Sequence, residues 1–312
     1  MTVLNKGFEY KTRLNSNVSG LKLIDFLIRY YSGFSFEVWM ERIESGRVLL
    51  DGIPAKGDTI LQSGQVLSWI RPPWEEPEVP LSFAILYRDE YLLAVAKPEG
   101  LPTIPGGGDF MEHTLLYLVR RHIPEAKPLH RLGRGTSGIV LFALTRESAS
   151  KISQALENRR ILKVYRALAS GHPDSNEFEI ETPIGPVPHP VLKTIHAASF
   201  TGKPAHSHII VLEHREGCSL LQIRITTGRP HQIRIHCAAS GYPLAGDPLY
   251  IAGGVPAKNS RALPSDLGYH LHNMLLGFPH PKTGKWTEVA CAPPPLLRLH
   301  NEITRWYCTN VC

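Results

Sequence analysis

The sequence is poor in cysteine and has no pattern that favours disulfide bonds. Its 312 residues include five cysteines, and no two of them form a C-x-x-C pair. An odd number at scattered positions argues against a disulfide framework and favours a reducing compartment. The five are Cys218, Cys237, Cys291, Cys308 and Cys312.

Long apolar segments, repeats and metal-ligand patterns are also missing. The first residues, MTVLNKGFEYKTRLN, have no apolar stretch of the secretory type, and no apolar run approaches the roughly 20 residues of a membrane span. Two His-x-His pairs, His206/His208 and His270/His272, lack a third ligand at a matching spacing. We therefore predict a cytoplasmic protein with no membrane anchor and no bound metal.

The composition is that of a basic globular protein. Hydrophobic residues make up 43% of the chain, charged residues make up 20%, and the formal net charge is +6. The apolar content suffices for one sizeable core and a small additional domain. The positive charge fits either an ordinary basic protein or a partner of polyanions, and only its distribution can separate the two.

A segment rich in proline and glutamate divides the chain. Residues 72–80 contain four prolines and three glutamates, which exclude a regular helix or a central strand. We interpret this segment as a linker between a small domain, residues 1–71, and a larger domain, residues 81–312.

The small domain has the pattern of two helices followed by a hairpin. Apolar residues at helical spacing begin at Leu21, and a second helix is expected over residues 36–44. Asp51-Gly52 then lies between two apolar runs, which is a tight-turn signal. The segment from Ile43 to Ile70 resembles the second half of an S4 RNA-binding domain. The alternative is a plain α+β appendage.

The larger domain is dominated by strands. Its apolar runs alternate with polar residues, as in SLLQIRIT, and they are not interleaved with helices in a βαβ rhythm. This order predicts an α+β fold with a mixed, mainly antiparallel sheet and peripheral helices. Residues 138–145 are expected to form a buried strand, and residues 111–122 a helix.

Three segments of this domain carry polar groups suited to a ligand. In residues 128–145, a loop of glycines and arginines enters the buried strand, although such a loop could also merely solvate a strand end. In residues 224–241, Arg229 lies between a strand and a helix that begins near Pro230, where an anion is expected beside it, either a carboxylate or a phosphate. On the strand at Lys163–Tyr165, the tyrosine ring has small neighbours and could stack on a base, or could be an ordinary core residue.

Together these segments resemble the RluA-type pseudouridine synthases. The catalytic-loop pattern His-Arg-Leu-Asp-x-x-Thr-Ser-Gly corresponds here to His130–Gly138, and Lys-x-Tyr corresponds to Lys163–Tyr165. The Gly-Arg-x-His-Gln-Ile-Arg-x-His pattern corresponds to Gly228–His236, and Gly-Asp-x-x-Tyr to Gly246–Tyr250. A late Leu-His…Phe-x-His-Pro-x-Thr-Gly run matches residues 271–284.

The resemblance implies a cofactor-free isomerase that flips a uridine out of ribosomal or transfer RNA and converts it to pseudouridine. It implies a monomer with structured RNA as its partner and no obligate protein partner. In this reading Arg131 fills the gap left by the flipped nucleotide, Tyr165 stacks on the uracil and Arg229 orients the catalytic group. The residues expected to contact RNA are His130, Arg134, Thr136, Lys163, His231, Gln232 and Arg234.

One position departs from the family pattern. The catalytic aspartate of the loop is replaced by Gly133, which can act neither as a nucleophile nor as a base. Another carboxylate could substitute for it, and the candidates are Asp109, Glu112 and Asp247, of which Asp247 lies in a family turn and is expected to be structural. The alternative is a catalytically impaired relative that binds or remodels RNA without isomerising it.

Overall fold

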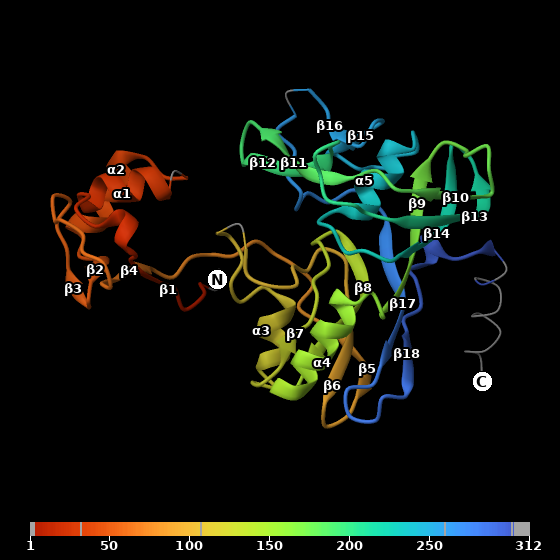
Figure 1. The fold of residues 1–312 in the computed structure, drawn as a ribbon, viewed down its shortest axis with the longest axis horizontal. Helices are drawn as coiled ribbons and strands as arrows, with labels where there is room; N and C mark the ends of the chain where they lie inside the picture. The colour runs from red at the N-terminus through yellow and green to blue at the C-terminus, as the bar shows by residue number, and fades with distance from the viewer. Residues whose placement is uncertain (1–3, 32, 107, 259, 301, 303–312) are drawn as a thin grey trace. The chain divides into compact units, whose positions relative to one another are not determined.

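The computed structural model describes residues 4–31, 33–106, 108–258, 260–300 and 302 (Figure 1). The chain divides into two compact units, Met1–Glu76 and Pro77–Cys312. The division falls inside the proline-rich segment 72–80. Within the described ranges, no helix combines the length and the apolar character needed to cross a membrane.

The N-terminal unit packs two helices against a small antiparallel sheet of strand order β1-β4-β2-β3. Ser35 caps the second helix by accepting a hydrogen bond from the Val38 amide, and this helix has the predicted bounds. Asp51 and Gly52 both have positive φ, at 50° and 84°, as the predicted tight turn requires. The sequence analysis did not predict the strand formed by Phe8–Arg13. The elements are β1 (Phe8–Arg13), α1 (Leu23–Tyr30), α2 (Phe36–Glu44), β2 (Val48–Leu50), β3 (Ile53–Pro54) and β4 (Val66–Arg71).

The larger unit is built on one mixed sheet of order β10-β13-β14-β9-β17-β8-β6-β5. All neighbouring strands are antiparallel except β17 and β8, so the predicted α+β class is confirmed. The strands are β5 (Ala84–Arg88), β6 (Leu92–Lys97), β8 (Thr136–Ala143), β9 (Leu162–Ser170), β10 (Glu177–Ile180), β13 (Ser207–Arg215), β14 (Cys218–Ile225) and β17 (Leu271–Pro279).

The sheet divides where β8 and β17 meet. These strands pair only between Thr136–Gly138 and Leu271–Asn273. Beyond that point β17 pairs with β18 (Trp286–Ala290), while β8 pairs with β7 (Lys127–Pro128). Gly138 has φ of 109°, and a Cβ there would lie 2.2 Å from the backbone oxygen of Asn273, so this approach requires glycine.

Helices and short hairpins cover the sheet. All eight residues of β8 are buried, which agrees with the continuous apolar run in its sequence. The helix predicted over residues 111–122 is shorter, because Thr114 caps it by accepting a hydrogen bond from Tyr117. The remaining elements are α3 (Leu115–Arg120), α4 (Arg146–Glu157), α5 (Gln232–Ala239), β11 (Ile184–His189), β12 (Lys193–Ala198), β15 (Tyr250–Ile251) and β16 (Val255–Pro256).

The described cysteines are free thiols. Cys218 and Cys291 are partly buried and Cys237 is buried. Cys308 and Cys312 lie outside the described residues. For the three described cysteines the expected absence of a disulfide bond therefore holds.

Candidate active site

The glycine- and arginine-rich loop is fixed to the edge of β8. The amide of Leu141 donates a hydrogen bond to Nε2 of His130 over 3.1 Å. Two residues on, Leu132 and the Thr103 hydroxyl exchange two hydrogen bonds, of 2.8 and 3.1 Å. Arg131 lies between these anchored residues and is exposed, so its guanidinium is available to a ligand while its backbone is held.

Arg134 joins this loop to the turn that follows β6. Its Nε donates to the Gly100 carbonyl over 3.1 Å, and the Gly100 amide donates back to the Arg134 carbonyl over 2.9 Å. Its guanidinium also lies 5.0 Å from the ring centre of Phe110. Arg134 is half-buried and holds the loop in place, and part of it is still accessible to RNA.

Gly133 lies on the exposed side of the loop, beside Tyr269. A Cβ at this position would lie 3.0 Å from the Tyr269 hydroxyl and 3.7 Å from the Thr136 hydroxyl. The Gly133 backbone does not have positive φ. A side chain at position 133 therefore requires only a small movement of the tyrosine hydroxyl.

Tyr165 lies on the central strand of the site. In β9 it is paired with Ile223 on one side and Asn273 on the other. Its side chain packs in the main core and is 7% exposed. Burial raises the pKa of the Tyr165 hydroxyl, so this residue stays neutral and offers an aromatic surface rather than a base.

Lys163 connects Tyr165 to the segment that carries Arg229. It is two residues before Tyr165 on β9, and its Nζ donates to the Thr227 carbonyl over 3.2 Å. Burial lowers the pKa of Lys163 to about 8. The pKa of His130 is lowered to about 4 by burial and, to a smaller extent, by the charge of Lys163.

The backbone of Arg229 is held by hydrogen bonds, and its side chain has no acidic partner in the part of the chain that the structure describes. Its amide donates to Gln232 Oε1 over 3.0 Å, and its Nε donates to the Pro204 carbonyl over 3.0 Å. Gln232 is itself fixed by the Thr227 hydroxyl and by the His206 carbonyl. Among the described residues no carboxylate lies within ion-pair distance of Arg229, so its predicted anion is not supplied by that part of the chain.

His231 follows Arg229 closely in the chain and is fixed by a hydrogen bond with Tyr250. It lies two residues after Arg229 and has a left-handed backbone with φ of 54°. The Tyr250 hydroxyl donates to the His196 carbonyl over 2.7 Å, so Nδ1 of His231 must donate to that hydroxyl. The pKa of His231 is lowered to about 3, mainly by burial, and the charge of Arg131 contributes to the shift.

Three residues expected to contact RNA lie in the interior instead. Arg234 is 2% exposed and donates from Nε and Nη2 to Asp247 over 2.6 and 2.7 Å. Its guanidinium also lies 4.1 Å from the Tyr269 ring centre. Thr136 and Gln232 are likewise buried. Each of the three is held by hydrogen bonds within the protein, so we expect these side chains to support the loops of the site.

The candidate carboxylates differ in their exposure to solvent. Asp247 is locked onto Arg234, in line with its expected structural role. Asp109 is exposed and Glu112 half-buried, and Asp109 directly precedes Phe110, which contacts Arg134. Sequence reasoning missed Glu99. This exposed residue precedes Gly100, and its charge adds to the effect of burial in raising the pKa of Tyr269.

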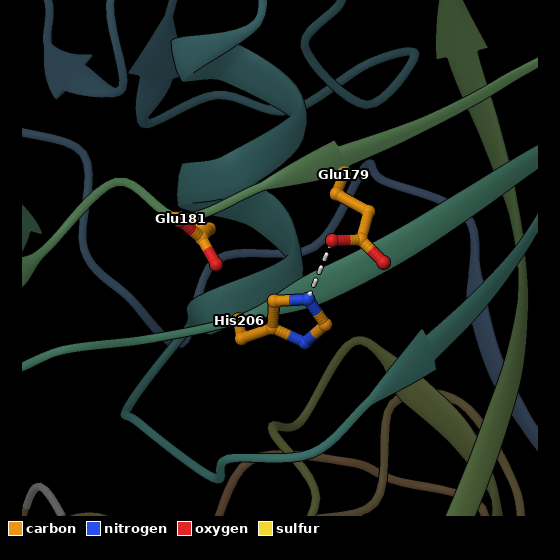
Figure 2. A group of neighbouring side chains, drawn as sticks. All are labelled: Glu179, Glu181 and His206. Carbon is orange, nitrogen blue, oxygen red and sulfur yellow. Dashed lines mark hydrogen bonds and ion pairs between the residues drawn. The ribbon is translucent and has the colours of Figure 1, made fainter.

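One group of side chains has the spacing of metal ligands. Ligand atoms of Glu179, Glu181 and His206 lie within 4.8 Å of one another (Figure 2). His206 Nε2 is 3.1 Å from Glu179 Oε2, while Nδ1 is 3.1 Å from the Thr226 hydroxyl. Both carboxylates are exposed, and such acidic groups also occur without a bound ion. His208 has a separate partner, Glu177, at 2.7 Å.

Comparison with known proteins identifies the family. The profile described as RNA pseudouridylate synthase matches residues 91–239. An uncharacterized RNA pseudouridine synthase of Synechocystis sp. is 43% identical over 277 residues, which is 88% of this chain and 95% of the relative. RNA pseudouridine synthase 5 of Arabidopsis thaliana is 36% identical over 355 residues, 96% of each chain. Ribosomal large subunit pseudouridine synthase D of Neisseria meningitidis is 33% identical over 273 residues, 83% of this chain and 71% of the relative.

The chain therefore belongs to the RluA-type family of RNA pseudouridine synthases, which are isomerases. Solved structures agree on the fold. Human RNA pseudouridylate synthase domain containing 1 matches with a TM-score of 0.57 at 24% identity, covering 75% of this chain and 98% of that one. Human RNA pseudouridylate synthase domain containing 4 matches with a TM-score of 0.52 at 21% identity, covering 69% and 90%.

Proposed function

We propose that this protein isomerises uridine to pseudouridine in ribosomal or transfer RNA after flipping the nucleotide out of its stack. The proposal is supported by the family of the chain, by the hydrogen bond from Lys163, on the strand of Tyr165, to the Thr227 carbonyl two residues before Arg229, and by the exposed position of Arg131 on an anchored loop. The relatives named as ribosomal large subunit synthases support ribosomal RNA as a substrate class.

We assign different roles to Arg131, Tyr165 and Arg229. Arg131 is an exposed cation on a fixed loop and would replace the stacking lost when the nucleotide leaves the helix. Tyr165 would provide the surface for the uracil. Arg229, which has no acidic partner among the described residues, would bind a phosphate of the substrate or orient the reacting carboxylate.

The reaction needs a group that Gly133 cannot supply. The C1′–N1 bond of uridine must break, the uracil must turn, C5 must bond to C1′, and the proton of C5 must leave while N1 gains one. We infer that an exposed carboxylate next to the loop assists, either Glu99 or Asp109. Both lie on segments that contact Arg134, the residue after Gly133.

Gly133 also supports a second candidate function. Losing the reacting group of an active site removes most of its rate. A chain that kept the RNA-binding loops without that group would bind or remodel RNA and leave uridine unchanged. The basic loops and the intact fold serve this function equally well.

We further infer a role for the N-terminal unit as an S4-like RNA-binding domain. Its order of helix, helix, strand, turn and strand supports this, as does the Asp51-Gly52 turn. We propose that the protein acts as a cytoplasmic monomer on structured RNA.

Mapping of pseudouridines tests the choice between the two functions. In total RNA from a strain that lacks the gene, we expect one or a few sites to lose the modification, and the purified protein should restore it on the transcribed target. An unchanged map would contradict the isomerase function and favour RNA binding without isomerisation.

Assays of variants on the RNA target found by this mapping identify the working carboxylate. Of Glu99→Gln and Asp109→Asn, the variant that loses this carboxylate should have a kcat at least about 100-fold lower. Glu216→Gln, an exposed site elsewhere, is the matched control.

A further inference from the structure

A basic aromatic pocket lies in the N-terminal unit, between α2 and β4. Its volume is about 220 Å³. Three arginines and two tryptophans line it together with one carboxylate: Arg42, Arg47, Arg71, Trp69, Trp74 and Glu41. Every one of these residues belongs to the same unit. The pocket is separate from the residues of the candidate active site, all of which follow residue 98.

Aromatic rings hold the cations of this pocket close together. The Arg42 guanidinium lies 3.8 Å from the Phe34 ring centre and 4.2 Å from that of Trp69. The Arg71 guanidinium lies 3.5 Å from the Trp74 ring centre. Burial lowers the pKa of Arg42, and the charge of Arg71 acts in the same direction. The like charges repel one another, and an anion in the pocket would relieve that repulsion.

Two donors of the pocket lining are buried without an acceptor. Nη1 of Arg42 and Nε1 of Trp69 have no hydrogen-bond partner among the described residues. Buried polar groups are nearly always hydrogen-bonded, so these two donors leave side chains of the pocket lining short of acceptors, and an anion bound in the pocket would supply them once the side chains shift toward it. Over the described ranges, neither Arg42 nor Arg47 forms an ion pair, so the carboxylate of Glu41 does not fill this role.

We infer that this pocket binds a phosphodiester of the RNA substrate. A phosphate accepts hydrogen bonds at several oxygens and is the anion that arginine recognises best. The volume is below the 300 Å³ or so of a drug-sized ligand site and suits one phosphate with part of its sugar. The choice of RNA rests on the proposed function, whereas binding of the anion rests on the pocket alone.

The first test observes the Trp69 indole N–H of the full-length protein by NMR, with Trp69→Phe to assign its resonance. Titration with inorganic phosphate should move this resonance in a saturable way, and chloride at equal ionic strength should not. Arg47→Gln should weaken phosphate binding about tenfold. Arg13→Gln removes the same charge at an exposed site of β1 and should leave it unchanged. A Trp69 resonance indifferent to phosphate, or equal effects of the two variants, would overturn the inference.

The second test asks whether the phosphate belongs to RNA. Oligouridylate should displace inorganic phosphate at a far lower concentration, and Arg47→Gln should reduce the slope of log affinity against log salt by about one. If the oligonucleotide binds no better than inorganic phosphate, the RNA assignment is wrong. A wild-type protein without pseudouridylation activity would count against the proposed function only, because the Trp69 response to phosphate does not depend on turnover.

Discussion

Arg229 and Arg234 lie five positions apart in one motif and have opposite environments. Arg229 is half-buried and donates to a backbone carbonyl, with no carboxylate beside it among the described residues. Arg234 is fully paired with Asp247 in the interior. The sequence analysis placed Arg229 in the catalytic machinery and Arg234 among the RNA contacts. The comparison indicates that burial and pairing, which the motif does not encode, decide whether an arginine of this segment is open to a ligand.

The largest effect is expected from breaking the buried pair. Asp247→Asn would leave Arg234 charged and without a partner in the interior, so the free energy of unfolding should fall by about 3–5 kcal/mol. Denaturant unfolding followed by circular dichroism measures this. Glu216→Gln, an exposed change of the same charge, should stay within about 0.5 kcal/mol. Equal stability of the two variants would show that the pair is not structural.

Arg229→Gln should have little effect on stability and a large effect on activity. Because the side chain makes one hydrogen bond to a neutral carbonyl, unfolding should change by no more than about 1 kcal/mol. The value of kcat/KM for pseudouridylation should fall about 100-fold, since a charged contact with the substrate or the reacting carboxylate is lost. Arg224→Gln, exposed on β14, controls for the loss of charge alone.

Introducing an aspartate at position 133 tests whether Arg229 can act on a carboxylate in the loop. Gly133→Asp should raise kcat about tenfold, because Arg229 would gain the acidic partner that it lacks. The gain should vanish in the double variant with Arg229→Gln, as a double-mutant cycle would show. A gain of equal size in both backgrounds would mean that the new carboxylate works without this arginine.

The smallest effect concerns pH. His231 has a pKa of about 3 in the folded protein, below its unfolded value near 6.5. Its contribution to stability is therefore complete above pH 6.5 and is lost as the pH falls from there toward 3. Allowing for its partial exposure, we expect a loss of about 1 kcal/mol between pH 7 and pH 5. His231→Gln should remove that part of the pH dependence, and the exposed His122→Gln should not.

Local signals predicted much of the fold. The helix predicted over residues 36–44 has these bounds in the structure, where Ser35 caps its first turn. The short helix after Thr114 was overestimated, because the cap lies three residues inside the apolar pattern. Strand β1 was missed, since FEYKTR is exposed or half-buried throughout and gains its partner only from β4.

The site was less accessible to sequence reasoning. The resemblance brought Arg131, Tyr165 and Arg229 together. It could not show that Arg234 is enclosed, because an arginine in an amphipathic helix usually faces water. Glu99 was overlooked because its position depends on hydrogen bonds between Gly100 and Arg134, which are 34 residues apart. Its location between Pro98 and Gly100, in a turn, was the available signal.

The short seam between β8 and β17 has a consequence for synthesis of the chain. Ser137 and His272 are hydrogen-bonded across 135 positions, and Tyr269, which lies beside Gly133, belongs to the same late segment. A ribosome must therefore reach residues 269–273 before the loop of Arg131, which Thr103 and Leu141 already anchor, gains its contact with Tyr269 and the seam can form. Pairing at such separation is slow, and the nascent chain exposes an open strand edge until it happens. A truncation before residue 271 would carry the side chains that we propose to contact RNA and would still lack the seam between β8 and β17.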